Sequence, residues 1–191
     1  MHFDENGVRI AGQLHGLHTA STATHTHLFV HEKRGTAALA SEASVLNDFH
    51  GTAVHDCWLP YFHFEQARHV LCCGVHLLCE LNGLMENGVR WAREMHELLL
   101  ALYHRPRPIL AADEVRGHYH RILAQANREE PPPHPGKQGK PKPSKGRNLL
   151  NRLREQEDGV LAFALEAGIP FTNNQAERDL RPAKIKQKVS G

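Results

Sequence analysis

Three acidic residues stand at the ends of predicted secondary-structure elements. Asp4 lies early in a strand-like segment, Asp56 follows the short apolar strand at 52–55, and Glu177 falls in the first turn of the last predicted helix. Carboxylates in such places can converge on Mg²⁺, which keeps water and phosphate oxygens as its other ligands. Two such ions can activate a water or a 3′-hydroxyl for in-line phosphoryl transfer. Taken one at a time, each acid is more simply explained as a solvated residue at an element's end.

The elements that must position these acids form a mixed α and β pattern. Residues 8–31 alternate loosely between apolar and polar, which predicts two or three antiparallel strands. Residues 36–48 carry a helical apolar stripe, and helical periodicity returns from about residue 68 to 103. Further helices are expected over 111–127 and 148–166, and a short one begins the tail at 172–191. The order indicates an α/β or α+β domain interrupted by a helical insertion.

The first turn of the tail helix offers two capping pairs. Thr172 with Gln175, or Asn174 with Glu177, has the spacing of a capping box. The residues leave both alternatives open.

Histidine is unusually frequent, with 16 among 191 residues. His25, His27 and His31 share the parity of one strand face, but no Cys/His quartet has the spacing of a structural zinc site. We interpret most histidines as scattered polar or half-buried residues, with a histidine-rich metal carrier as the weaker alternative. His55 directly precedes Asp56, so on a strand its side chain points to the opposite face, and we expect it in the core.

Basic residues gather in two segments, although the formal net charge is only +2. The segment 131–147 holds six prolines, five basic residues and no acid, which is typical of a solvated linker or loop. The tail places a basic run beside Glu177. Both segments could follow DNA phosphates with salt-dependent affinity, or be solvated charge runs. The tail residues expected to bind DNA are Arg178, Arg181, Lys184, Lys186 and Lys188.

Composition and patterning exclude several classes of protein. No stretch approaches the roughly 18 apolar residues of a membrane span, and the N-terminus lacks the pattern of a signal peptide. Four cysteines in a chain of this length do not make a disulfide scaffold, and we read them as reduced thiols, with metal binding possible. We therefore expect a cytoplasmic protein without a membrane partner.

Five segments resemble, in order, the insertion sequence 66 family of bacterial transposases. The block TNNQAERDLRPAKIKQKVSG (172–191) is similar to the family's C-terminal catalytic motif, and the likeness covers nearly the whole chain. The other matching segments are DENGVRIAGQLHGLHTAST (4–22), VHEKRG (30–35), VHDCWLPYF (54–62) and CGVHLLCELNGL (73–84). The resemblance implies a ribonuclease-H-like catalytic core. It also implies an Asp-Asp-Glu triad of Asp4, Asp56 and Glu177, which would bind Mg²⁺ or Mn²⁺.

Some further motif residues follow from the resemblance. The family's Cys-x-x-His element corresponds to Cys73 and His76, which share a face if they lie on a helix. That spacing suits a metal-ligand pair, a contact near the triad, or packing, and packing is favoured because two ligands alone do not make a zinc site. Asn174 is expected to support the motif around Glu177. Cys79 stands where the family usually has arginine, so one basic contact is expected to be missing.

The resemblance also predicts the domain organisation and the activity. The fold class expected is α/β, a ribonuclease-H-like mixed sheet with flanking helices and a mainly helical insertion between the second Asp and the Glu. The expected ranges are 1–67 and 148–191 for the two parts of the core, the latter with a helix, 68–130 for the insertion and 131–147 for the linker or loop.

The activity expected is metal-dependent DNA cleavage and strand transfer, in an intact protein that forms a homo-oligomer. Against related proteins this chain looks truncated at both ends. The alternative is therefore a catalytically silent, DNA-binding remnant.

Overall fold

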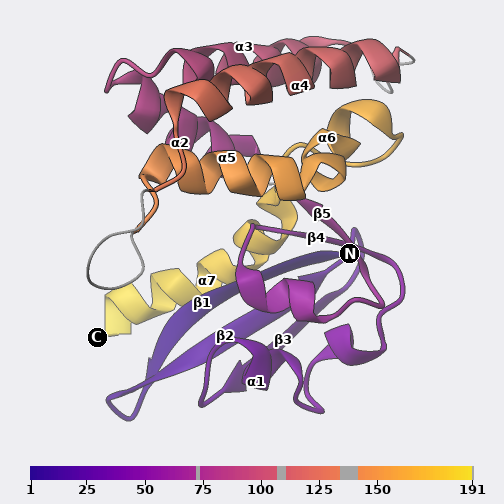
Figure 1. The fold of residues 1–191 in the computed structure, drawn as a ribbon. Helices are drawn as coiled ribbons and strands as arrows, with labels where there is room; N and C mark the ends of the chain where they lie inside the picture. Colours follow the sequence, from indigo (N-terminus) through magenta and orange to yellow (C-terminus); the bar gives the residue numbers. More distant parts are fainter. Residues whose placement is uncertain (72–73, 107–110, 134–141, 191) are drawn as a thin grey trace. The chain divides into compact units, whose positions relative to one another are not determined.

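The computed structural model describes residues 1–71, 74–106, 111–133 and 142–190, with side chains as far as residue 186. It divides into two compact units, one made of Met1–Cys73 with Thr172–Gly191 and the other of Gly74–Phe171 (Figure 1). We call them the sheet unit and the helical unit and describe each by itself. The first and last segments of the chain therefore share one unit.

The sheet unit contains a five-stranded mixed sheet with the order β3-β2-β1-β4-β5 (Figure 1). β1 pairs antiparallel with β2, and β2 with β3, whereas β4 is parallel to β1 and β5 to β4. Ala11 and Gly12 join β1 to β2 with φ values of 50° and 81°, as a two-residue hairpin turn with both residues left-handed requires. The strands are β1 (His2–Ile10), β2 (Gln13–Ser21), β3 (Thr26–His31), β4 (Thr52–His55) and β5 (Arg68–Leu71). With its flanking helices, this sheet confirms the α/β fold class.

The two faces of the sheet carry different side chains, because neighbouring residues of a strand point to opposite faces. Phe3 lies on the face that packs beneath the short helices α1 (Thr36–Leu39), η1 (Val45–Asp48) and η2 (Leu59–His63). The other face supports α7 (Asn174–Ser190), whose Ala176 and Leu180 are buried. Asp4, the neighbour of Phe3 in β1, therefore lies on the face that supports α7.

The helical unit consists of α2 (Gly74–Met85), α3 (Arg90–His104), α4 (Ala112–Glu129), α5 (Lys145–Glu155) and α6 (Glu157–Leu165). Its core is built on large apolar side chains such as Trp91, Met95 and Ile122, each at most 1% exposed. The Tyr119 hydroxyl donates to the Leu153 carbonyl at 2.9 Å, so a polar group inside this core has a partner. No helix among the described residues combines the length and the apolar character needed to cross a bilayer.

Several expected elements have different limits in the structure. The predicted helix from residue 68 begins only at Gly74, because 68–71 form strand β5 beside β4. A four-residue segment shows no clear period, so its pairing with β4 decided its conformation. The predicted helix over 148–166 is two helices that meet at Gln156. The tail helix has 17 residues rather than being short.

The predicted helix over 36–48 is also wrong in its middle part. Only Thr36–Leu39 is α-helical, and a 3₁₀ turn follows at Val45–Asp48. The Ser41 hydroxyl donates to the Ala38 carbonyl at 2.7 Å, and the Ser44 hydroxyl accepts from the Leu46 amide at 3.2 Å. Serine side chains that bond the local backbone in this way compete with a continuous helix.

The ranges expected for the domains also differ from those of the two compact units. The sheet unit extends to Cys73 rather than to residue 67, because strand β5 belongs to it. The helices over 145–165 belong to the helical unit, and the sheet unit resumes at Thr172. Within the expected linker at 131–147, α5 already begins at Lys145, and residues 134–141 lie outside the described part of the chain.

Two buried histidines make the sheet unit sensitive to acid. His18 is 1% exposed, stacks on Phe29 with ring centroids 4.9 Å apart, and both of its ring nitrogens are buried without a hydrogen-bond partner among the described residues. Burial lowers the pKa of His18, and it lowers the pKa of His55 to about 4. Both imidazoles are therefore held neutral in the folded state.

We expect the free energy of unfolding to fall as the pH drops below about 6.5, because histidines of the unfolded chain then bind protons that the buried histidines of the folded state do not bind. Each such histidine steepens the slope by at most about 1.4 kcal/mol per pH unit. Urea unfolding between pH 8 and 5 measures this slope. His18→Leu should flatten it, whereas His118→Leu at an exposed position of α4 should not. Equal slopes in all three proteins would contradict the burial argument.

Candidate functional site

Asp4 is the third residue of β1 and is partly buried on the α7 face. Its Oδ1 accepts a hydrogen bond from the Glu5 amide at 2.8 Å. The pKa of Asp4 is raised from 3.8 to about 6, first by burial and then by the negative charges of Asp56 and Glu177, while the Glu5 amide and Lys184 act in the opposite direction. Asp4 therefore lies within electrostatic reach of both other predicted acids.

Asp56 follows β4 directly, at the level of Asp4 in the sheet. His2 pairs with Val54, so the same parallel register carried two residues further brings Asp4 opposite Asp56. The Asp56 carboxylate accepts from the Trp58 amide at 3.2 Å, which ties it to the turn that begins η2. Glu177 lies in the first turn of α7, and its side chain is exposed. One sheet face thus gathers acids from positions 4, 56 and 177.

The ligand types at this site suit a divalent cation, but the positions of the side chains do not. Three carboxylates that repel one another offer the hard oxygen ligands that Mg²⁺ and Mn²⁺ prefer, and a cation would relieve their repulsion. Yet in the part of the chain that the structure describes, no group of three or more His, Cys, Asp or Glu side chains is arranged to hold a metal ion. The ligand types therefore fit a divalent cation, and binding one would need the side chains to draw closer together.

Tyr61 is a neighbour of this site that the sequence did not reveal. It is 1% exposed, and its hydroxyl is buried without a hydrogen-bond partner among the described residues. Its pKa is raised by burial and by the charges of Asp56, Asp4 and Glu5. The available signal was its position in the segment at 54–62, which matches the transposase pattern around Asp56.

Histidines contribute to the core and to local turns. His55 is fully buried, as expected, and its Nε2 lies 3.0 Å from the Nδ1 of His69. Its Nδ1 makes a short contact with the Asp56 carbonyl. His27 and His31 both lie in β3 and interact with nearby backbone, whereas His25 precedes the strand, so the three do not share one strand face.

The motif-supporting residues have mixed outcomes. His76 is exposed on α2 in the helical unit, and Cys73 lies outside the described residues, so their expected pairing stays a prediction. Asn174 is exposed, whereas its neighbour Asn173 is only 4% exposed and bonds to β1. The supporting role expected of Asn174 stays a prediction, and Asn173 is a buried contact of β1 that residue type and spacing did not single out.

The basic residues of the tail lie along α7. Arg178, Arg181, Lys184 and Lys186 are exposed, and the side chain of Lys188 lies outside the described residues. Arg178 donates to the Gln175 side chain at 2.8 Å. Arg181 and Lys184 follow Glu177 at helical spacings of four and seven residues, so they share its face of the helix. Lys184 is also the base whose charge reaches Asp4.

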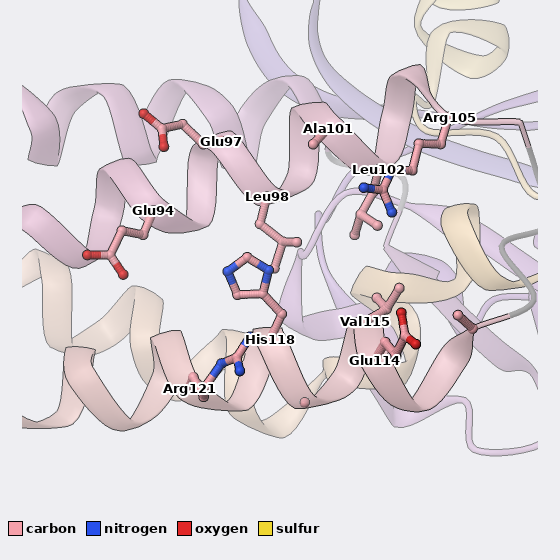
Figure 2. A pocket seen from close by; sticks show the side chains of 12 residues that line it. Glu94, Glu97, Leu98, Ala101, Leu102, Arg105, Glu114, Val115, His118 and Arg121 are labelled. Carbon is pink, nitrogen blue, oxygen red and sulfur yellow. The ribbon is translucent and has the colours of Figure 1, made fainter.

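A groove of about 680 Å³ lies between α3 and α4 of the helical unit (Figure 2). Leu98, Leu102 and Val115 supply apolar surface, and His118 points from α4 toward Leu98 (Figure 2). Acidic and basic side chains occur together along its walls. It contains none of the residues predicted to form the catalytic site.

The sheet and its side chains define a class before any comparison is made. This is an α/β protein in which acids from three separate segments of the chain lie within electrostatic reach of one another on one sheet face, beside a basic helix. Residues 1–191 match the family model described as Transposase IS66 family, and the chain belongs to that family. The family assigns it to the transposition of insertion sequences and implies that it binds DNA. No curated protein and no solved structure matches the chain.

Replacing Asp4 should stabilise the protein, because the folded state holds its carboxylate at an electrostatic cost. We expect Asp4→Asn to raise the free energy of unfolding by about 1–2 kcal/mol at pH 8, allowing for solvent screening of a partly exposed group. A raised carboxyl pKa disfavours folding above about pH 6, so the gain should vanish as the pH falls below about 4. Urea unfolding at several pH values measures this difference.

The control is Asp48→Asn, which changes an exposed acid of the same unit. It should give no comparable gain at pH 8. Destabilisation by Asp4→Asn across the whole pH range would show that Asp4 is a structural acid and not one of a repelling set.

Proposed function

We propose that the sheet unit is the catalytic domain of a DNA transposase with a ribonuclease-H-like core. Asp4, Asp56 and Glu177 hold Mg²⁺ or Mn²⁺ and act on DNA phosphodiester bonds. The observation that carries this proposal is the arrangement of the three acids in one unit, where the β1–β4 register brings Asp4 opposite Asp56 and the charges of Asp56 and Glu177 both reach Asp4. Acids that repel one another on a folded surface are typical of functional sites, because selection for stability alone would not keep like charges close together.

The reaction follows from the chemistry of such a site. A water attacks the phosphorus at the transposon end, its proton passes to solvent, and the 3′-oxygen leaves as a free hydroxyl. That 3′-hydroxyl then attacks a phosphorus of the target DNA and loses its proton to solvent, the P–O3′ bond of the target breaks, and the target's 3′-oxygen leaves as a hydroxyl, so that a strand is transferred without a covalent bond to the protein. A divalent cation supplies activation of the attacking oxygen and stabilisation of the leaving oxygen.

The chain's own residues bind and orient the reactants. The three carboxylates would hold the cation from β1, the end of β4 and the first turn of α7. Arg181 and Lys184 lie on the Glu177 face of α7, where they can hold the phosphates of the strand that is cut. The homo-oligomer expected of the intact protein stays a prediction from the family.

A second function is favoured by one specific observation. No metal-holding group of three side chains occurs among the described residues. A catalytically silent DNA-binding domain would have this property as well, since phosphate contacts by basic side chains require no metal. The two functions differ in whether the chain cleaves DNA or only binds it.

Metal-dependent nicking distinguishes the two functions. We expect the chain to nick supercoiled plasmid DNA in the presence of Mn²⁺, and Glu177→Gln to slow nicking by about 100-fold or more because one cation ligand is lost. Glu65→Gln, at an exposed acid of the same unit, is the matched control and should nick at the wild-type rate. Undiminished nicking by the Glu177 variant would rule out the triad. Binding without nicking by the wild-type chain would support the silent domain.

The DNA contacts of α7 have their own test. We expect Arg181→Ala and Lys184→Ala each to weaken binding to a short DNA duplex and to reduce the slope of log affinity against log salt concentration by about one. Fluorescence anisotropy at several salt concentrations measures both quantities. Arg93→Ala, at an exposed arginine of the helical unit, is the control. A slope unchanged by the two α7 variants would place the DNA elsewhere.

A further inference from the structure

The backbone hydrogen bonds that pair β1 with β4 end just before the level of the first two acids, Asp4 and Asp56. The Val54 amide donates to the Met1 carbonyl at 2.8 Å, and the N-terminal ammonium donates to the Thr52 carbonyl at 2.8 Å. Alternate carbonyls of a strand point to the same side, so the next acceptor of β1 that faces β4 is the Phe3 carbonyl. In a continuing ladder it would accept from the next β4 amide.

The side chain of Asn173 takes this place instead. Its Nδ2 donates to the Phe3 carbonyl at 2.7 Å, and its Oδ1 lies 2.9 Å from the Nδ1 of His2. Asn173 is 4% exposed, so these are buried contacts that water cannot easily replace. A side-chain amide from the far end of the chain therefore satisfies the backbone of β1 next to Asp4.

Asn173 also belongs to the first turn that carries Glu177. It immediately precedes α7, and its carbonyl accepts from the Glu177 amide at 3.3 Å. One residue thus contacts the strand of Asp4 through its side chain and the backbone of Glu177 through its main chain. Asn173 makes both contacts at the point where the pairing of β1 with β4 ends.

A second attachment, made by Asp179, holds α7 to the sheet at a distance from Asn173. The Asp179 carboxylate accepts from the Thr26 hydroxyl at 2.8 Å and from the Gln175 amide at 3.1 Å, and it also bonds to Ser21. Ser21 of β2 pairs with Thr26 of β3, and β1 lies between these two strands and β4. Glu177 lies between the two attachment points, so its position along the sheet is set from both sides.

We propose that Asn173 is a positioning residue, whose amide ends the β1–β4 ladder beside Asp4 and fixes the Glu177 turn next to it. This role rests on the proposed function, in which the carboxylates act together. Without the amide, the first turn of α7 can move away from β1, and the repulsion among the acids is relieved. With it, the first turn of α7 is held beside β1, from where the three side chains can draw together around a cation.

A thermodynamic cycle without metal tests this role. Urea unfolding at pH 8 is measured for the wild type, Asp4→Asn, Asn173→Ala and the double variant, and again with Asn174→Ala in place of Asn173→Ala. Asn174 is the adjacent, exposed asparagine and serves as the matched control. We expect Asp4→Asn to stabilise the wild type and the Asn174 variant equally, and to stabilise the Asn173 variant by less than half as much. Equal gains in all three backgrounds would overturn the proposal, because a merely structural contact adds independently.

Binding of Mn²⁺, measured by electron paramagnetic resonance, provides the second readout. We expect Asn173→Ala to weaken Mn²⁺ binding by at least tenfold, and Asn174→Ala by less than twofold. Val70→Ala, which removes buried volume from β5, controls for general loss of stability and should also stay within twofold. A loss in the Val70 variant equal to that in the Asn173 variant would overturn the positioning role.

The two proposals fail in distinguishable ways. A wild-type chain that binds no Mn²⁺ would overturn the proposed function, whereas the metal-free cycle still decides the role of Asn173. If Asn173→Ala does not fold, Asn173→Ser enters the same cycle, because its shorter side chain keeps a polar group at this buried position but cannot make both contacts of the amide. A gain from Asp4→Asn that is undiminished in the serine variant would likewise count against the proposal.

Discussion

The sheet unit depends on the attachment of helix α7 to strand β1, because this contact joins the two ends of the chain. The hydrogen bond from the Asn173 side chain to the Phe3 carbonyl spans 170 positions in sequence. Closing so long a loop costs conformational entropy, and the burial of Ala176 and Leu180 against the sheet offsets that cost. The amide adds direction to a non-directional apolar contact. It selects one position of the helix along the strand.

This arrangement has an electrostatic cost in folding free energy. Burial, together with the charges of Asp56 and Glu177, raises the pKa of Asp4 to about 6, so at neutral pH the folded state retains a carboxylate that burial and repulsion both disfavour. Lys184 opposes this effect through its opposite charge. A divalent cation would relieve it far more strongly, since it interacts with all three acids at short range. In the proposed function, the electrostatic cost of the metal-free site would also be the origin of its affinity for a cation.

The abundant histidines have a different meaning from the one that their number first suggests. His18 and His55 are buried and held neutral, and His69 bonds to His55 and lies near the Phe64 carbonyl. In the described part of the chain they form no metal-holding group. Imidazole contributes here as a flat, polarisable side chain, with His18 stacked on Phe29 and His55 packed at a tilt against Tyr61. In the proposed function, the chemistry of the sheet unit depends on its acids.

The sequence by itself determined the α/β class and the existence of most helices and strands, and its resemblance to the family predicted the three acids of the proposed site. Hydrophobic periodicity is a local property, and an acid at the end of an element can be recognised without its partners. It also placed His55 in the core, because parity along a strand fixes the face. It failed where local patterns are short or equivocal, as in strand β5 and in the turn that contains Ser41 and Ser44.

Only the tertiary structure decided which neighbours the acids have. Asn173 and Asn174 are identical in type and adjacent in sequence, and one is buried against β1 while the other faces solvent. Tyr61 acquires its place near Asp56 and Asp4 from the packing of η2 under the sheet. Such contacts depend on atoms that are far apart along the chain, so residue type and spacing could not specify them.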